Sequence, residues 1–277
     1  MKSFIKLIFL SLFILASCKQ TNTSNLSSGT PRIMPGSCSI GKWSNLSSPV
    51  NLKMSSDFNG DFTNADLVGG LNPLEQMAKA WNDAVSPTPL LKVPFETTAT
   101  SGNNSLSNFR DNELGIYKSY NWFSNVSSNA LAITQFYGIV RSDGSLGTYI
   151  DLTHADIIVN YRDFASDFTM TGNPMIAYDL PTVVLHEMGH FLGLCHEVNA
   201  DSIMAPYYFT SQRNLRTFDT NKIKALYQDN QNLSSKTSIK QNAISNPIGT
   251  EVTGIIELNA NGHCRHFVNG KLVYEHN

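Results

Sequence analysis

Apolar and polar positions alternate over short segments in the first half of the chain and recur at helical spacing in longer ones. Residues 50–54 alternate as a half-buried strand does. After Asn72 and Pro73, apolar residues recur every three or four positions as far as Val85, which predicts a helix with Asn72 as its N-cap. Apolar runs separated by Asn-, Ser- and Gly-rich turns predict further strands at about 91–95, 115–120, 131–140 and 155–160. This pattern predicts an α+β domain.

Two more helices and a terminal pair of strands follow. Asp179 can cap a helix that runs to Gly193, and Asp219 can cap a closing helix that ends near Asn230. Beyond it, residues 252–258 and 267–273 are apolar stretches, and the Asn269-Gly270 pair in the second one favours a hairpin turn. We therefore expect one folded domain at 42–231, followed at 232–277 by a linker and a small β appendage.

The N-terminus has the pattern of an export signal. Two lysines precede an apolar run from Leu7 to Ala16, which is too short to span a bilayer as a permanent helix. The sequence from Leu15 to Cys18 resembles the bacterial lipobox, in which the cysteine is lipidated; cleavage that leaves a free thiol is the alternative. We expect a signal peptide at 1–17, a lipidated Cys18, and a tether at 18–41 rich in Ser, Thr, Asn, Pro and Gly.

We therefore expect the protein to be exported and held at a bacterial membrane by its N-terminal lipid anchor. In a two-membraned cell, Lys19 after the anchor favours the outer membrane or the cell surface.

Composition narrows the function classes. The chain is 41% hydrophobic and 15% charged, too apolar for a disordered protein, and its formal charge of −2 comes without any run of Lys or Arg. We therefore expect no nucleic-acid partner, and a monomer. Cys38, Cys195 and Cys264 remain beyond the anchor, which allows one disulfide at most, and the sequence does not choose the pair.

The residues that carry chemistry lie between His186 and His196. On a helix, residues four apart differ by about 40° around the axis, so His186 and His190 can reach one metal ion. Glu187 stands beside them, where its carboxylate can take a proton from a metal-bound water. Gly193 can turn the chain back so that His196 supplies a third imidazole. Three neutral nitrogens and a water make a catalytic zinc arrangement.

This spacing, with Met204 following at the right distance, resembles the metzincin metalloendopeptidases. The turn from Ser202 to Tyr208 is similar to that of the matrixins, the family of the matrix metalloproteinases. The resemblance implies a twisted mixed five-stranded sheet with three helices, and one catalytic Zn²⁺ between the active-site helix and a Met-turn at Met204. It also implies that Pro206 and Tyr208 line the substrate pocket.

The activity that the resemblance implies is that of a zinc metalloendopeptidase, which cleaves peptide bonds in proteins by Glu187-assisted attack of zinc-bound water. An extended protein or peptide substrate would pair with the edge strand of the sheet, which we place at Leu131–Phe136.

Some residues depart from the matrixin pattern. Glu197 after the third histidine is more like an astacin, so an astacin-like metzincin protease stays an alternative. His154 is the only histidine where animal matrixins bind a second, structural zinc, so we expect no second zinc there and interpret His154 as a strand-end histidine with its hydrogen bonds satisfied. Residues 57–61 have oxygen donors like half of a calcium loop but fit a polar turn better. Ca²⁺ elsewhere is implied by the resemblance alone.

A different class of function is a lipid-anchored binding module with a vestigial protease site. Against it, all three candidate ligands and the candidate base are present.

Overall fold

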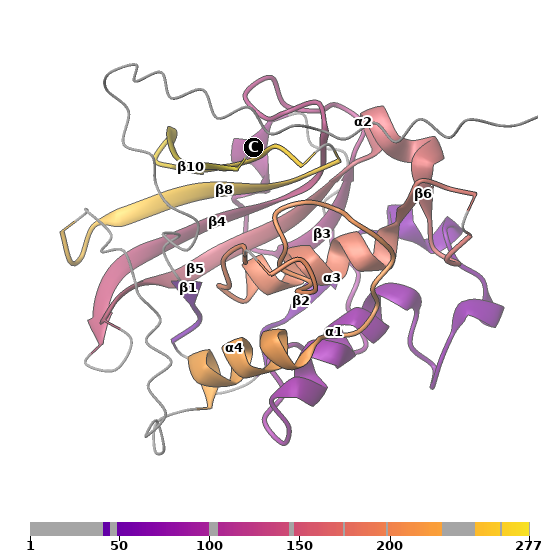
Figure 1. Cartoon of the computed structure of the whole chain (residues 1–277), viewed down its shortest axis with the longest axis horizontal. Helices are drawn as coiled ribbons and strands as arrows, with labels where there is room; N and C mark the ends of the chain where they lie inside the picture. The colour runs from indigo at the N-terminus through magenta and orange to yellow at the C-terminus, as the bar shows by residue number, and fades with distance from the viewer. Residues whose placement is uncertain are drawn as a thin grey trace, which may run out of the picture. The chain divides into compact units, whose positions relative to one another are not determined.

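The computed structural model describes residues 41–44, 49–99, 105–143, 147–173, 175–197, 199–228, 247–260 and 262–276 (Figure 1). All of them belong to one of the two compact units of the chain, Arg32–Asn277. The expected signal peptide, Cys18, nearly all of the expected tether and residues 232–246 of the expected linker lie outside the described residues. Within the described ranges, no helix has the length and apolar character needed to cross a membrane.

A mixed β-sheet forms the centre of the fold (Figure 1). Its strands run in the order β10-β9-β8-β4-β5-β3-β2, and β1 pairs with β5. Strands β2, β3 and β5 are parallel to one another, whereas β4 is antiparallel to both β5 and β8. The bounds are β1 (Gly41–Lys42), β2 (Leu52–Met54), β3 (Leu114–Ser119), β4 (Ala130–Asp143), β5 (Gly147–Asn160), β8 (Glu251–Asn259), β9 (Cys264–Val268) and β10 (Lys271–His276). Strands β6 (Phe168–Thr169) and β7 (Tyr178–Asp179) form a separate small pair.

The described α-helices are α1 (Pro73–Ala84), α2 (Tyr161–Phe164), α3 (Leu180–Phe191) and α4 (Thr217–Tyr227). Helix α1 begins where the sequence predicts, because the Asn72 side chain accepts hydrogen bonds from the backbone N–H groups of Leu74 and Glu75. Helix α4 begins two residues before the predicted cap. Arg216 is its N-cap residue, and Asp219 lies inside the first turn, where its carboxylate accepts the Arg216 N–H.

Helix α3 is the most deeply buried element, since each of its residues is buried. It packs on the sheet together with α1, whose Trp81 Nε1 donates to the Leu185 carbonyl at 3.0 Å. The main hydrophobic core joins these helices to one face of the sheet. A second cluster on the other face includes Phe109, Tyr117, Ile133 and Ile158. An all-buried helix against a rigid sheet is a firm support for side chains that must hold a fixed geometry.

The α+β class is confirmed, but the sheet is larger than the expected five strands. Eight described strands belong to it, because β8, β9 and β10 continue the sheet beyond β4 and β1 adds to β5. Residues 251–276 are therefore β-structure, as the Asn269-Gly270 signal indicates, yet they are part of the main sheet. The expectation that Leu131–Phe136 is a free edge is wrong for this structure, since β4 is paired on both sides.

Candidate metal centre and active site

Helix α3 holds the first two candidate ligands. Asp179 caps it by accepting the Thr182 N–H at 3.2 Å, and Pro181 occupies its first turn. The Asp179 carboxylate is itself held by the guanidinium of Arg213. One helical turn separates His186 from His190, and their Nε2 atoms lie 3.0 Å apart.

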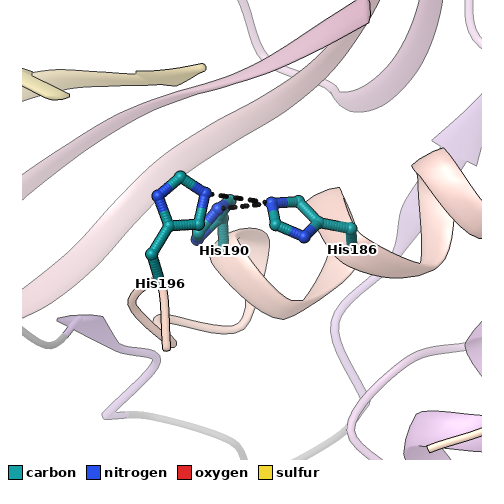
Figure 2. A group of neighbouring side chains, drawn as sticks. All are labelled: His186, His190 and His196. Carbon is teal, nitrogen blue, oxygen red and sulfur yellow. Dashed lines mark hydrogen bonds between the residues drawn. The ribbon is translucent and has the colours of Figure 1, made fainter. Parts of the chain in front are cut away.

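The third candidate ligand comes from the turn after α3. Gly193 adopts a φ of 96°, and its N–H donates to the His190 carbonyl at 2.8 Å, so the chain reverses direction as soon as the helix ends. The turn brings Nε2 of His196 to 3.1 Å from Nε2 of His186 (Figure 2). The three rings converge on one point from two sides, as the sequence spacing predicts.

The outer nitrogen of each ring has its own partner. Nδ1 of His186 donates to the Ile203 carbonyl at 2.6 Å, and Nδ1 of His190 donates to the Leu194 carbonyl at 2.8 Å. Nδ1 of His196 lies 2.7 Å from Nε2 of His266 on β9. Because a carbonyl can only accept, it places the proton of the first two rings on Nδ1 and leaves the Nε2 lone pair free.

The donor set fits a zinc ion. Three neutral imidazoles whose Nε2 atoms face one another, each with Nδ1 bonded to a partner, are the ligand set of a catalytic zinc site. Burial lowers the pKa of His186 to about 4 and lowers the pKa of His190 as well, so both rings are neutral and able to coordinate at pH 7.

Glu187 is fully buried beside this set. Its Oε2 accepts the hydroxyl of Thr134 on β4 at 2.6 Å, while its Oε1 has no hydrogen-bond partner among the described residues. Burial raises the pKa of Glu187 to about 8, against the opposing effect of the Thr134 hydrogen bond. One oxygen is thus fixed and the other is free to bond to a reactant.

Met204 lies directly under the histidines. A Cβ placed on Gly189, between the two helical ligands, would be 2.2 Å from the Met204 sulfur. The turn that carries Met204 is tied back by its own backbone, since Glu197 N–H donates to the Met204 carbonyl at 2.8 Å. The close approach explains why glycine stands at 189 in the motif, and it places Met204 where the Met-turn is expected.

The two residues expected to line a substrate pocket behave differently. Tyr208 lines a cavity of about 30 Å³ beside His186, and its hydroxyl accepts the Asp179 N–H at 3.0 Å. Pro206 is not among the residues that line this cavity; its carbonyl instead accepts the thiol of Cys264. Leu258 of β8 closes the cavity from the other side.

Two residues near the site have no signal in the sequence. Thr134 lies inside an apolar strand, and His266 lies 70 residues beyond the ligand that it contacts. Thr134 reaches Glu187 because α3 packs on β4, and His266 reaches His196 because β8 pairs with β4 and β9 pairs with β8.

Three residues that the sequence does not place in the zinc site have structural partners. His154 Nε2 lies 2.8 Å from the Phe109 carbonyl and 2.7 Å from the Asp156 carboxylate, which agrees with its interpretation as a satisfied histidine. Asp61, in the segment that resembles half a calcium loop, pairs with Lys118 and accepts the hydroxyl of Tyr161. The Glu197 carboxylate pairs with Lys222 at 3.0 Å.

The cysteines near the site differ in state. Cys195, next to the third ligand, is disulfide-bonded. Cys264 is free and buried. Cys38 and Cys18 lie outside the described part of the chain.

The fold and the site resemble those of the matrixin-like metzincins: a mixed sheet backed by a buried helix, a histidine triad, and a methionine turn beside it. Comparison with known proteins agrees. Residues 141–228 match the model of the Matrixin family. A stretch of 70 residues is 41% identical to the interstitial collagenase of Equus caballus and covers 25% of this chain. The match spans about 15% of the length of that collagenase.

Proposed function

We propose that this chain is a zinc-dependent endopeptidase that hydrolyses peptide bonds in proteins. The observation that carries the proposal is the convergence of three Nε2 atoms, two of the pairs 3.0 and 3.1 Å apart, beside a buried glutamate with one unbonded oxygen. His186, His190 and His196 would hold the ion. When bound, zinc supplies Lewis-acid polarisation of the scissile carbonyl and favours deprotonation of the attacking water.

Glu187 acts as the base and later as the acid. Its free Oε1 accepts the proton of the attacking water, and the same oxygen then donates it to the leaving amine. Thr134 fixes the carboxylate through Oε2, so the group needs little reorganisation between the two transfers. The pKa of Glu187 is raised because its carboxyl group is buried with no cation nearby. A positive charge beside the carboxyl group would favour its ionised form.

The substrate is an extended peptide. β4 is paired with β8 in this structure, so a peptide would lie along β4 in the place of β8, and the space beside His186, with Tyr208 as one wall, would then receive a side chain. This arrangement supplies affinity through the main chain and selectivity through the pocket.

For location we propose the one that the sequence alone predicts, with Cys18 as a lipid anchor at a bacterial membrane and protein or peptide substrates met outside the cytoplasm. Metabolic labelling with a fatty-acid analogue, for the wild type and Cys18→Ala, tests the anchor.

The activity is tested with zinc-loaded protein, a quenched peptide library and the Glu187→Gln variant. We expect cleavage by the wild type, loss of cleavage on chelation, and a loss of about 10²–10⁴-fold in Glu187→Gln with zinc still bound. Full activity of the metal-free protein would contradict the zinc chemistry, and wild-type turnover by Glu187→Gln would contradict the assigned base.

A further inference from the structure

Strand β8 lies where an extended peptide would lie across this site. It pairs antiparallel with β4 from Ala130↔Asn259 to Ile139↔Glu251. At its end, Asn259 pairs in parallel with Tyr207, in the segment that follows the Met-turn. A single extended segment is thus bonded to the sheet on one side and to the pocket-forming segment on the other. This is strand addition to a sheet edge, the mode by which extended peptides are bound.

The inward side chains of β8 lie on either side of the histidines. Leu258, directly opposite Ala132, lines the cavity beside His186 and Tyr208. Ile256, opposite Thr134, lines a second small cavity beside His190. The backbone of Glu257 connects the two, so it passes between the cavities on either side of the triad. Side chains alternate along a strand, which is why residues two apart face the site together.

The result is a closed site. The exposed fractions are 2% for His186, 2% for His190, 6% for His196 and 0% for Glu187. The cavity beside Leu258, at about 30 Å³, has room for about two waters and none for a substrate side chain. A protein substrate cannot reach the histidines while β8 is in place.

Side chains of β8 and β9 hold β8 against the site. His266 on β9 contacts the ligand His196 through its ring nitrogen at 2.7 Å. The thiol of Cys264 bonds to the Pro206 carbonyl. On the outer face, the buried Glu257 carboxylate pairs with Arg265 and accepts the Ser127 N–H at 2.9 Å. The residues of β8 and β9 that make these contacts lie beyond the segment that matches the family model.

We propose that the C-terminal strands β8–β10 are a tethered occupant of the peptide groove, so that this structure is a latent form of the protein. A substrate enters only when β8 leaves β4. The proposal rests on the proposed function, because the groove is defined as a substrate groove by that function. It accounts for a complete zinc site that is sealed from solvent by the chain's own strand.

The first experiment weakens the docking of β8 in the full chain. A Cβ on Gly254 would lie 2.1 Å from the buried ring of Phe136, so Gly254→Val should push β8 off β4. Leu258→Asp places a charge in the cavity beside His186. Both variants, loaded with zinc, should cleave a quenched peptide about tenfold or more faster than the wild type, because the competent fraction rises. Leu272→Asp, on the half-exposed side of β10, is the matched control and should not change the rate.

A second variant keeps β8 in place by a covalent bond. Gln135 and Ile255 are direct partners on β4 and β8 and lie on the face opposite to Thr134, so Gln135→Cys with Ile255→Cys can form a disulfide without touching the histidines. We expect the oxidised form to be inactive and mild reduction to restore cleavage. Wild-type protein given the same reductant controls for the disulfide of Cys195. Equal cleavage by the oxidised and reduced forms would overturn the proposal.

A readout without catalysis separates this proposal from the proposed function. In Glu187→Gln protein, modification of Cys264 by a thiol reagent reports whether the strands are docked, because the thiol is fully buried in the closed form. We expect labelling about tenfold or more faster with Gly254→Val than without it. Faster labelling with no cleavage by any variant would refute the peptidase and leave the docked occupant intact. Equal labelling, or measurable cleavage that is as fast in the wild type as in Gly254→Val, would refute the occupant.

Discussion

Nε2 of His266 lies 2.7 Å from Nδ1 of His196, so a residue of the C-terminal strands holds the outer nitrogen of a candidate zinc ligand. The other two ligands bond to backbone carbonyls, which no side-chain substitution removes. His196 is therefore the ligand whose orientation depends on a side chain.

We predict that His266→Ala weakens zinc binding by the full chain about 10–100-fold, because the ring of His196 loses the partner that fixes its tautomer and direction. Competition with a chromophoric chelator measures the dissociation constant. His263→Ala, which removes a half-exposed histidine just before β9, is the control and should bind zinc as the wild type does. An unchanged affinity in His266→Ala would show that the contact does not orient the ligand.

A second prediction concerns the glycine between the helical ligands. Gly189→Ala should destabilise the protein by about 1–3 kcal/mol, although alanine is the better helix former, because its Cβ would overlap the Met204 sulfur. Urea unfolding gives the difference. Gly60→Ala has no atom within 4 Å of the new Cβ and should cost much less. The double variant with Met204→Ala should lose less than the two single losses added together, and additivity would argue against the contact.

Asp179 combines a helix cap with an ion pair, and graded substitutions separate the two. Asp179→Ala removes both from a site that is 3% exposed, so we expect a loss of about 3 kcal/mol. Asp179→Asn keeps an oxygen for the Thr182 N–H and should lose less. Asp83→Ala, which breaks the exposed pair with Lys79, should be nearly neutral. Unfolding free energies that do not follow this order would contradict the account.

The pair of His154 and Asp156 predicts a dependence of stability on pH. Burial raises the pKa of Asp156 to about 6, against the effect of its bond to His154. For His154, burial acts downward, but the bond to Asp156 and its charge bring the pKa above the usual value. Both groups therefore bind protons more tightly in the folded state. The contribution of the pair to stability falls as pH rises from about 4 to 6 through Asp156, and falls further above about 6.5 as His154 loses its proton.

Urea unfolding at pH 5, 6, 7 and 8 tests this sign. The stability of the wild type relative to the double variant His154→Gln, Asp156→Asn should decrease as pH rises, and the contributions of the other histidines cancel in the difference. A relative stability that rises with pH would contradict the assignment.

The sequence predicts the metal centre well because its parts are local. The ligands and the base lie within eleven residues on one helix and one turn, and helix geometry alone places His186 beside His190. The caps at Asn72 and Asp179 are predicted for the same reason, since each side chain bonds to backbone two or three residues away. Local rules decide such features before any tertiary contact forms.

The position of β8 depends on a contact that no local rule encodes. The apolar stretch from Val252 to Leu258 predicts a strand, and a strand forms there with Val252, Ile256 and Leu258 in the main core. It does not say which strand of the sheet will pair with it, because register and partner are set by packing across more than a hundred residues. For that reason β4 is predicted from the sequence to be a free edge, and no role is predicted for His266 or Thr134.

The backbone contact between Gly41 and Gly193 has a practical consequence for preparing shorter forms of the protein. The Gly41 N–H donates to the Gly193 carbonyl at 3.0 Å, and the Gly41 carbonyl fills the space that a Cβ on Gly193 would need. Gly193 opens the turn that delivers His196. A fragment that starts at residue 42, the domain boundary predicted from sequence, would lack the contact between Gly41 and Gly193. We expect the position of His196 to be less well fixed in such a fragment. Expression boundaries for the folded domain should therefore lie upstream of Gly41.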